Sequence, residues 1–112
     1  MHSLVKKWFE GLRSGEYPQG RYSLEQEGAY CCLGVLHVVG GCELPKERQT
    51  SQVPESLRKQ VGPGFTELEC ERLATMNDRG DTFREIAAYI NGRADYWKQP
   101  PPPEDEEGME ED

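Results

Sequence analysis

The sequence predicts an α+β fold that is mainly helical, with about four helices, one small β-hairpin, a single compact core and a disordered acidic C-terminal tail. Three features support this class. Apolar residues recur at helical spacing near the N-terminus, two Thr-x-x-Glu sequences open further helical segments, and four prolines precede a dense run of acids. We therefore expect one globular domain over residues 1–98 and a Pro-rich, then acidic, flexible tail over residues 99–112.

The first helix is expected to begin near Ser3, which can cap it, and to end near Gly15. Five apolar residues form one stripe at helical period along this segment. The stripe comprises Leu4, Val5, Trp8, Phe9 and Leu12. We expect it to pack against the core.

A short hairpin is expected next, because helical period is lost and Tyr22 and Leu24 alternate with polar residues. Residues 26–28 then form the turn, and residues 30–31 return as the second strand. The apolar run 32–39 that follows fits either a buried helix or a buried strand, since periodicity does not separate the two. We favour a helix, although its three valines favour a strand.

Three helices are expected in the second half of the chain. A short one runs from Pro54 to Gly62, and two capped ones begin at residues 66–69 and 82–85. The second capped helix is expected to end at residues 91–92. The first is expected to direct three apolar side chains to the core, namely Leu68, Leu73 and Met76.

The five-residue link 77–81 between the capped helices predicts a helical hairpin or corner. We expect Asn77 to occupy the C-terminal cap of the first helix and Gly80 to adopt a positive φ that lets the chain reverse.

Charge is divided unevenly along the chain. Of 21 acidic residues, seven follow the prolines, so residues 1–103 hold 14 acids and all 13 basic residues. The net charge of −8 is thus about −1 in the body and −7 in the tail. The tail acids are the candidate partner-binding residues Glu104, Asp105, Glu106, Glu107, Glu110, Glu111 and Asp112. Such a segment attracts basic surfaces and repels phosphate.

The apolar and cysteine patterns predict a location. The longest apolar run, residues 29–39, is too short for a membrane helix, and no basic-then-apolar leader opens the sequence. The four cysteines then read as reduced thiols. We expect a protein of the host cytoplasm, without a membrane partner, whose oligomeric state is left open between monomer and dimer.

Three sequence segments carry a resemblance. They are Trp8-x3-Leu-Arg-Ser-Gly-x-Tyr-x-Gln-Gly, Tyr30-Cys-Cys-Leu-Gly-Val-Leu, and Met76-Asn-Asp-x-Gly-x-Thr-Phe-x2-Ile-Ala-x2-Ile. Together they resemble a family of small, uncharacterised proteins of tailed phages and prophages, over residues 8–90. The acidic tail departs from that family's pattern. The resemblance implies a phage accessory protein, of a kind often directed against host defences, and it provides no catalytic residues to carry over to this chain.

Metal, cofactor and enzymatic roles are not expected. The cysteine spacing contains neither Cys-x2-Cys nor His-x3–5-His, so no metal site is predicted. Cys31 or Cys32 with His37 offers a nominal thiol and base, but no motif activates the nucleophile. We therefore expect no catalytic residues and no cofactor.

DNA binding is likewise not expected. Residues 82–87 resemble the first helix of a helix-turn-helix motif. The sequence after residues 91–92 is too short for a recognition helix, and the acidic tail would repel the duplex.

Two functional hypotheses remain, and both are non-catalytic. The first is an inhibitor of a host defence system that binds a basic surface of a host protein, as a charge mimic of nucleic acid. The alternative is a small-molecule binder that sequesters a nucleotide-like immune signal. Its candidate residues offer guanidinium, amide and aromatic groups in or near one loop. They are Arg13, Tyr17, Gln19, Arg21 and Tyr22.

Overall fold

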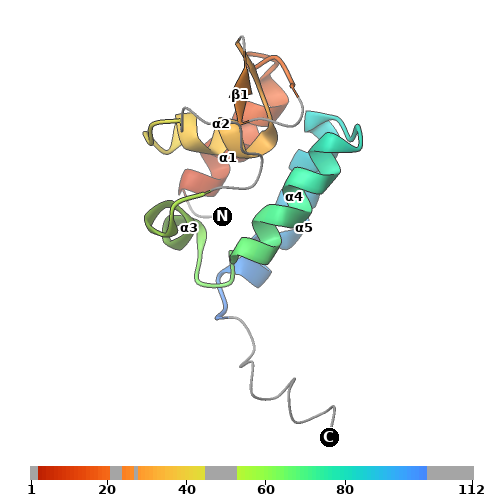
Figure 1. Ribbon diagram of the computed structural model, residues 1–112. Helices are drawn as coiled ribbons and strands as arrows, with labels where there is room; N and C mark the ends of the chain where they lie inside the picture. The colour runs from red at the N-terminus through yellow and green to blue at the C-terminus, as the bar shows by residue number, and fades with distance from the viewer. Residues whose placement is uncertain (1–2, 21–23, 27, 45–52, 101–112) are drawn as a thin grey trace, which may run out of the picture.

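Five helices and one short β-ladder make up the part of the chain that the computed structural model describes, which is residues 3–20, 24–26, 28–44 and 53–100 (Figure 1). In chain order the elements are α1 (Ser3–Ser14), β1 (Glu25–Gln26), β2 (Ala29–Tyr30), α2 (Cys32–Val39), α3 (Glu55–Val61), α4 (Glu67–Asp78) and α5 (Phe83–Trp97). The mainly helical class and the single core are confirmed. The described residues hold five helices rather than about four, because the ambiguous run 32–39 and the short segment after Pro54 are both helical.

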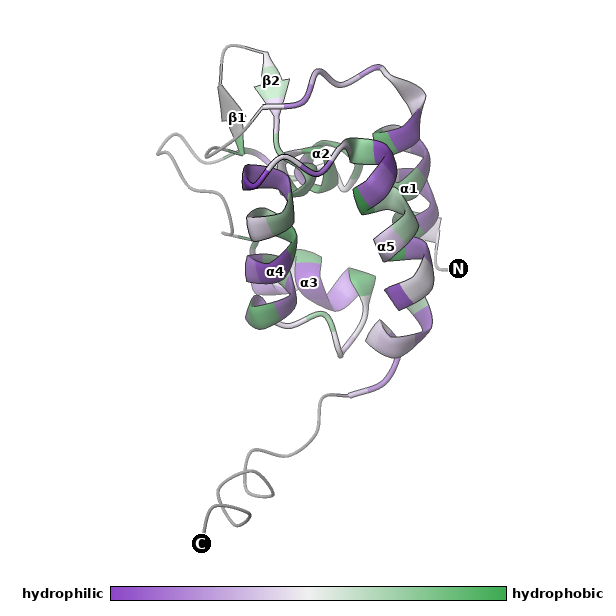
Figure 2. Cartoon of the chain, turned by 90° about the vertical axis from the view of Figure 1, so that its right-hand side faces the viewer, coloured by the Kyte–Doolittle hydropathy of each residue, from purple (hydrophilic) through white to green (hydrophobic). Residues whose placement is uncertain are grey.

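Helix α2 lies at the centre of the fold, and all its residues from Cys32 to His37 are buried. Helix α1 contacts both α2 and α5, while α4 packs on α2. Figure 2 shows α4 and α5 on either side of the face turned to the viewer, with α3 behind them. A helix apolar all round is stable only where neighbours cover it on every side, and this arrangement explains why 32–39 is helical.

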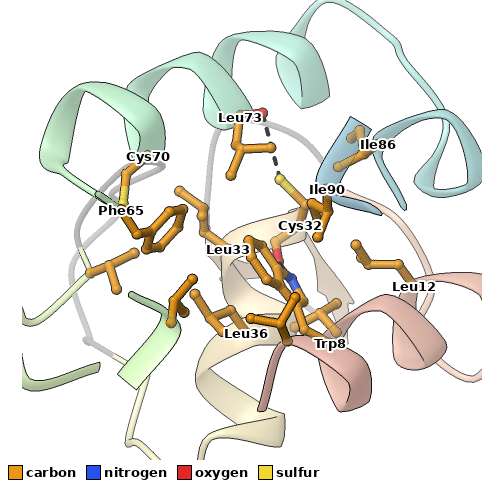
Figure 3. Close-up of a cluster of buried hydrophobic side chains, with 14 of the residues drawn as sticks. Trp8, Leu12, Cys32, Leu33, Leu36, Phe65, Cys70, Leu73, Ile86 and Ile90 are labelled. Atoms are coloured by element: carbon orange, nitrogen blue, oxygen red, sulfur yellow. Dashed lines mark hydrogen bonds between the residues drawn. The ribbon is translucent and has the colours of Figure 1, made fainter. Parts of the chain in front are cut away.

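Aromatic side chains join distant parts of the chain in the core (Figure 3). The ring of Phe65 lies 4.7 Å from that of Trp97 and 5.7 Å from that of Trp8, both edge-on. The indole nitrogen of Trp8 donates a hydrogen bond of 2.8 Å to the Cys32 carbonyl. Because Trp8, Phe65 and Trp97 come from three segments, the core closes only when both halves of the chain are present.

The hairpin is displaced from its expected position. β1 and β2 are antiparallel and pair Glu25 with Tyr30 and Gln26 with Ala29. Leu24 was expected in the first strand but lies before it, buried, and its carbonyl accepts from the Cys31 amide. The expected strand residues 22–23 lie outside the described part.

Gly34 is required where α2 crosses the chain at Leu24. A Cβ built on Gly34 would lie within 1.9 Å of the Leu24 carbonyl oxygen, whereas one built on Gly92 of α5 would meet nothing within 4 Å. Gly34→Ala is therefore expected to lower the free energy of unfolding by about 2 kcal/mol through overpacking. Gly92→Ala, the matched change, is expected to raise it by about 0.5–1 kcal/mol through helix propensity. Urea denaturation of both variants measures the sign of each change in the free energy of unfolding. Equal changes in the two variants would contradict this packing.

The two expected capping boxes have different outcomes. In α5 the box is complete, since Thr82 accepts from the Glu85 amide and the Glu85 carboxylate accepts from the Thr82 amide. In α4, Thr66 accepts from the Glu69 amide at 3.5 Å, but the Thr66 amide donates to the Gly64 carbonyl. The Glu69 carboxylate is directed to α5 instead.

The link between α4 and α5 is shorter than expected. α4 continues to Asp78 and its C-cap is Arg79, so Asn77 lies within the helix rather than at its cap. α5 also passes the expected stop at residues 91–92 and ends at Trp97. Burial of Ala94 and Trp97 continues the core face of α5 and outweighs the weak helix propensity of Asn and Gly.

Gly80 has φ +110°, as the need for a chain reversal predicted. Gly80→Val is expected to lower the free energy of unfolding by about 1–3 kcal/mol, because a β-branched residue is strained at positive φ. Thermal or denaturant unfolding measures the effect, and a valine variant as stable as the parent would contradict the role of this glycine.

The expected tail begins at the last described residues, and its acids lie outside the described part. None of the described helices is both long and apolar enough to cross a bilayer.

Candidate functional site

The loop predicted to hold a nucleotide-like ligand is bonded to the protein itself. Both amide hydrogens of Gln19 are used, by the Asn77 side-chain oxygen at 3.0 Å and the Asp81 carbonyl at 2.7 Å. Its oxygen accepts from the Phe83 amide at 3.1 Å. Because Phe83 opens α5, Gln19 satisfies a helix N–H that has no partner within the helix. A ligand would have to break these bonds to use the amide.

The other described candidates of that loop make separate contacts. The Tyr17 ring packs edge-on against Tyr30 at 5.6 Å, and the Arg13 guanidinium lies 5.3 Å from the Phe9 ring within α1. Arg21 and Tyr22 lie outside the described residues. The ligand hypothesis therefore stays a prediction, and the contacts of its described residues do not add to it.

Asn77 makes the corresponding contact at the start of α2. Its side chain is fully buried, its oxygen accepts from the Cys32 amide at 3.2 Å, and its nitrogen donates to the Gly20 carbonyl at 2.7 Å. Cys31, the N-cap residue of α2, makes no side-chain capping bond. Asn77 thus supplies from α4 a side-chain acceptor for the first amide of α2.

The nominal thiol and base are core groups. Cys31, Cys32 and His37 are all at most 1% exposed. Burial raises the pKa of Cys31 to about 11 and that of Cys32 well above its ordinary value. Burial also lowers the pKa of His37, partly offset by its 2.8 Å hydrogen bond with the Leu33 carbonyl. Protonated, covered thiols are poor nucleophiles.

Thiol labelling tests this placement. In the native protein only Cys42, which is partly exposed, is expected to react quickly with a disulfide reagent. The other three thiols should react only after denaturation, since burial also raises the pKa of Cys70 to about 12. Fast native reaction of a Cys42→Ser variant would show that a core thiol is accessible.

Among the described residues, no group of three or more His, Cys, Asp or Glu side chains is placed to hold a metal ion. A surface hollow lies instead along α4 and reaches α5 at Tyr89. We call it the α4–α5 groove, a hollow of about 540 Å³. It is lined by Leu68, Glu71, Arg72, Thr75, Met76, Arg79 and Tyr89.

The groove combines exposed apolar and cationic side chains. Leu68 is 57% exposed, and the Arg72 and Arg79 side chains are 52% and 63% exposed. Arg79 forms a two-bonded pair with Asp81 near one end. The groove thus carries one well-exposed leucine and two arginines, and arginine is among the residues enriched in protein interfaces.

Two arginines meet one buried carboxylate near the other end of the groove. Two nitrogens of Arg93 bond the buried Glu69 carboxylate at 3.1 and 3.0 Å, and the Trp97 indole donates to it at 2.9 Å. Arg72 approaches the same carboxylate to 3.8 Å, so two cations share one anion. Burial alone would raise the pKa of Glu69, but these hydrogen bonds and the charges of both arginines hold it below its ordinary value.

Exposed aromatic surface continues from this cluster towards the end of α5. The Arg93 guanidinium lies 4.0 Å from the centre of the Tyr96 ring, which is 43% exposed. Leu68 and Tyr96 are two of three large hydrophobic residues exposed in the described part of the chain.

The expectation that Leu68 faces the core was wrong. At 100° per residue, Leu68 lies 140° from Leu73 around the helix. The core face of α4 instead carries Cys70, Leu73, Ala74 and Asn77. The angular separation was available in the sequence, and it is the signal that could have found the groove.

Comparison with known proteins gives one family. A family model described as a domain of unknown function, DUF8296, matches residues 1–60. The chain belongs to this family. No curated protein and no solved structure matches. The matched DUF8296 range covers α1, β1, β2, α2 and most of α3, whereas the α4–α5 groove lies beyond it.

Proposed function

We propose that the protein is a non-catalytic phage accessory protein that inhibits a host defence system in the host cytoplasm by binding a basic surface of a protein partner. The observation that carries this proposal is the division of charge, about −1 for residues 1–103 and −7 for residues 104–112. A dense anionic segment accelerates association with cationic surfaces and competes with nucleic acid for them.

The described surface supports protein binding. The α4–α5 groove offers apolar surface from Leu68, Met76 and Tyr89 to a protein partner, while its arginines would repel a basic one. The polar groups first considered for a small ligand or for catalysis are part of the fold itself. Gln19 hydrogen-bonds to other residues of the protein, and the thiols of Cys31 and Cys32 are buried. The phage assignment rests on the sequence resemblance alone.

Phage plating tests the function. The protein is expressed in a panel of bacterial strains that each carry one defence system, and we expect plaque formation to be restored in at least one strain. Replacing the seven tail acids by Gln or Asn is expected to abolish the rescue. A protein in which residues 104–112 are scrambled, with charge retained, is the matched control and should rescue as well as the parent.

Two results would contradict the proposal. The parent protein could restore plaques in no strain of the panel. Alternatively, the neutralised and scrambled proteins could rescue equally, which would remove the acidic segment from the mechanism.

A further inference from the structure

Two features of this chain have complementary chemistry, and the described chain ends beside one of them. One is the α4–α5 groove, with its arginines and exposed apolar residues. The other is the segment 104–112, which carries seven acids and a single apolar side chain, Met109. We propose that residues 104–112 bind the α4–α5 groove of the same molecule, with Met109 on its apolar floor and the acids beside Arg72 and Arg79.

The point where the chain leaves the fold makes this contact possible. The Trp97 indole bonds Glu69 in the first turn of α4, and the Trp97 carbonyl accepts from the Gly64 amide just before that helix. The end of α5 is therefore beside the start of α4, as Figure 1 also shows. Segment 104–112 is thus tethered next to the Leu68 end of the groove.

The length of the segment suffices to follow the groove. Leu68 and Arg79 are eleven residues apart on one helix, which is about 16 Å. Residues 101–103 span about 9 Å in the extended conformation that proline favours. Residues 104–112 then span up to about 30 Å when extended. The acids can thus reach every lining residue of α4.

Charge and apolar contact both favour this occupant. Arg72 is the second cation on a carboxylate that Arg93 already pairs, so it retains attraction for a further anion. Arg79 is held by Asp81 only in an exposed pair, and such pairs are weak enough to be exchanged. The negative charge of Glu71 repels the acids of the segment and so opposes the binding. Leu68, Met76 and Tyr89 offer an apolar surface to Met109.

Tethering favours the same molecule over a second copy. A short linker gives an effective concentration on the order of millimolar, and at that concentration even a weak intramolecular contact is populated. The proposal rests on the proposed function in one respect: the acids assigned to a partner are held by the protein's own arginines until a more basic surface displaces them. The groove would then act as an internal competitor that favours strongly basic partners.

Paramagnetic broadening in the full-length protein tests this contact without any partner. Gly108→Cys places a nitroxide beside Met109, in a Cys42→Ser background where the other thiols are buried. At low salt we expect loss of amide signals around Arg72, Met76 and Arg79, and recovery of these signals at high salt. Arg72→Gln with Arg79→Gln should also restore them. Lys6→Gln with Lys7→Gln removes the same charge from exposed positions of α1 and should not.

Each contrary result has a definite meaning. No selective broadening of the groove, or broadening unaffected by the arginine changes, overturns the proposal. Broadening in a mixture of spin-labelled unenriched protein with isotope-enriched unlabelled protein shows docking on a second copy, and overturns it as well. A failed plating assay with the broadening intact refutes the proposed function and leaves the internal contact standing.

Discussion

Replacement of Asn77 by Ala is expected to lower the free energy of unfolding by about 4 kcal/mol, because it leaves two backbone groups without partners. These are the Cys32 amide at the start of α2 and the Gly20 carbonyl, and Asn77 itself is fully buried. Gln19 loses one of its bonds as well. Denaturant titration measures this loss of unfolding free energy, and the slope of the free energy against denaturant concentration should be unchanged.

Thr75→Ala is the matched control on the exposed side of α4, and it should change stability by no more than about 0.5 kcal/mol. Gln19→Ala should fall between the two, since its contacts are partly exposed. An Asn77→Ala variant within about 1 kcal/mol of the parent would show that water or a rearranged loop satisfies these groups.

Replacement of Glu69 by Ala is expected to lower the free energy of unfolding by about 3 kcal/mol. It leaves the Trp97 indole nitrogen buried without an acceptor and removes the partner of Arg93. Arg93 is about one quarter exposed, so water can partly replace its lost bonds. Glu71→Gln changes the neighbouring exposed carboxylate and is the control, with little expected effect.

The lowered pKa of the Glu69 carboxylate predicts how the stability of the protein depends on pH. The pKa of Glu69 is lower in the folded protein than in the unfolded chain, so its stabilisation is fully present above the unfolded pKa, about 4.3. It is lost as pH falls through the folded pKa. The stability difference between the parent and Glu69→Gln should therefore shrink below about pH 4. A difference that is constant from pH 7 to pH 3 would contradict the lowered pKa.

Local patterns predicted most of the helices. The apolar stripe of α1, the cap at Thr82 and the reversal at Gly80 depend on residues within a few positions of one another, and the structure confirms each. The end of α5 could not be predicted in this way. It depends on Trp97 reaching Phe65 and Glu69, and such contacts outweigh propensity at residues 91–92.

The candidate site was less predictable than the fold. Gln19 was selected because it offers hydrogen bonds, but the sequence does not show that those bonds are used by Asn77, Asp81 and Phe83. Similarly, Glu69 fits a capping box by spacing, yet Arg93 and Trp97 hold its carboxylate on α5. In both cases the polar group bonds a residue far along the chain, and local spacing does not show such a partner.

The capping of α2 by Asn77 and of α5 by Gln19 has a consequence for cooperativity. Each half of the chain completes a helix terminus in the other, so neither half can open locally without exposing amides in its counterpart. Amide hydrogens in α2 and α5 should then exchange through one common opening of the whole globule. The family-matched residues 1–60 of this chain would accordingly not be a folding unit alone, because α4 and α5 supply groups that complete their core and the start of α2.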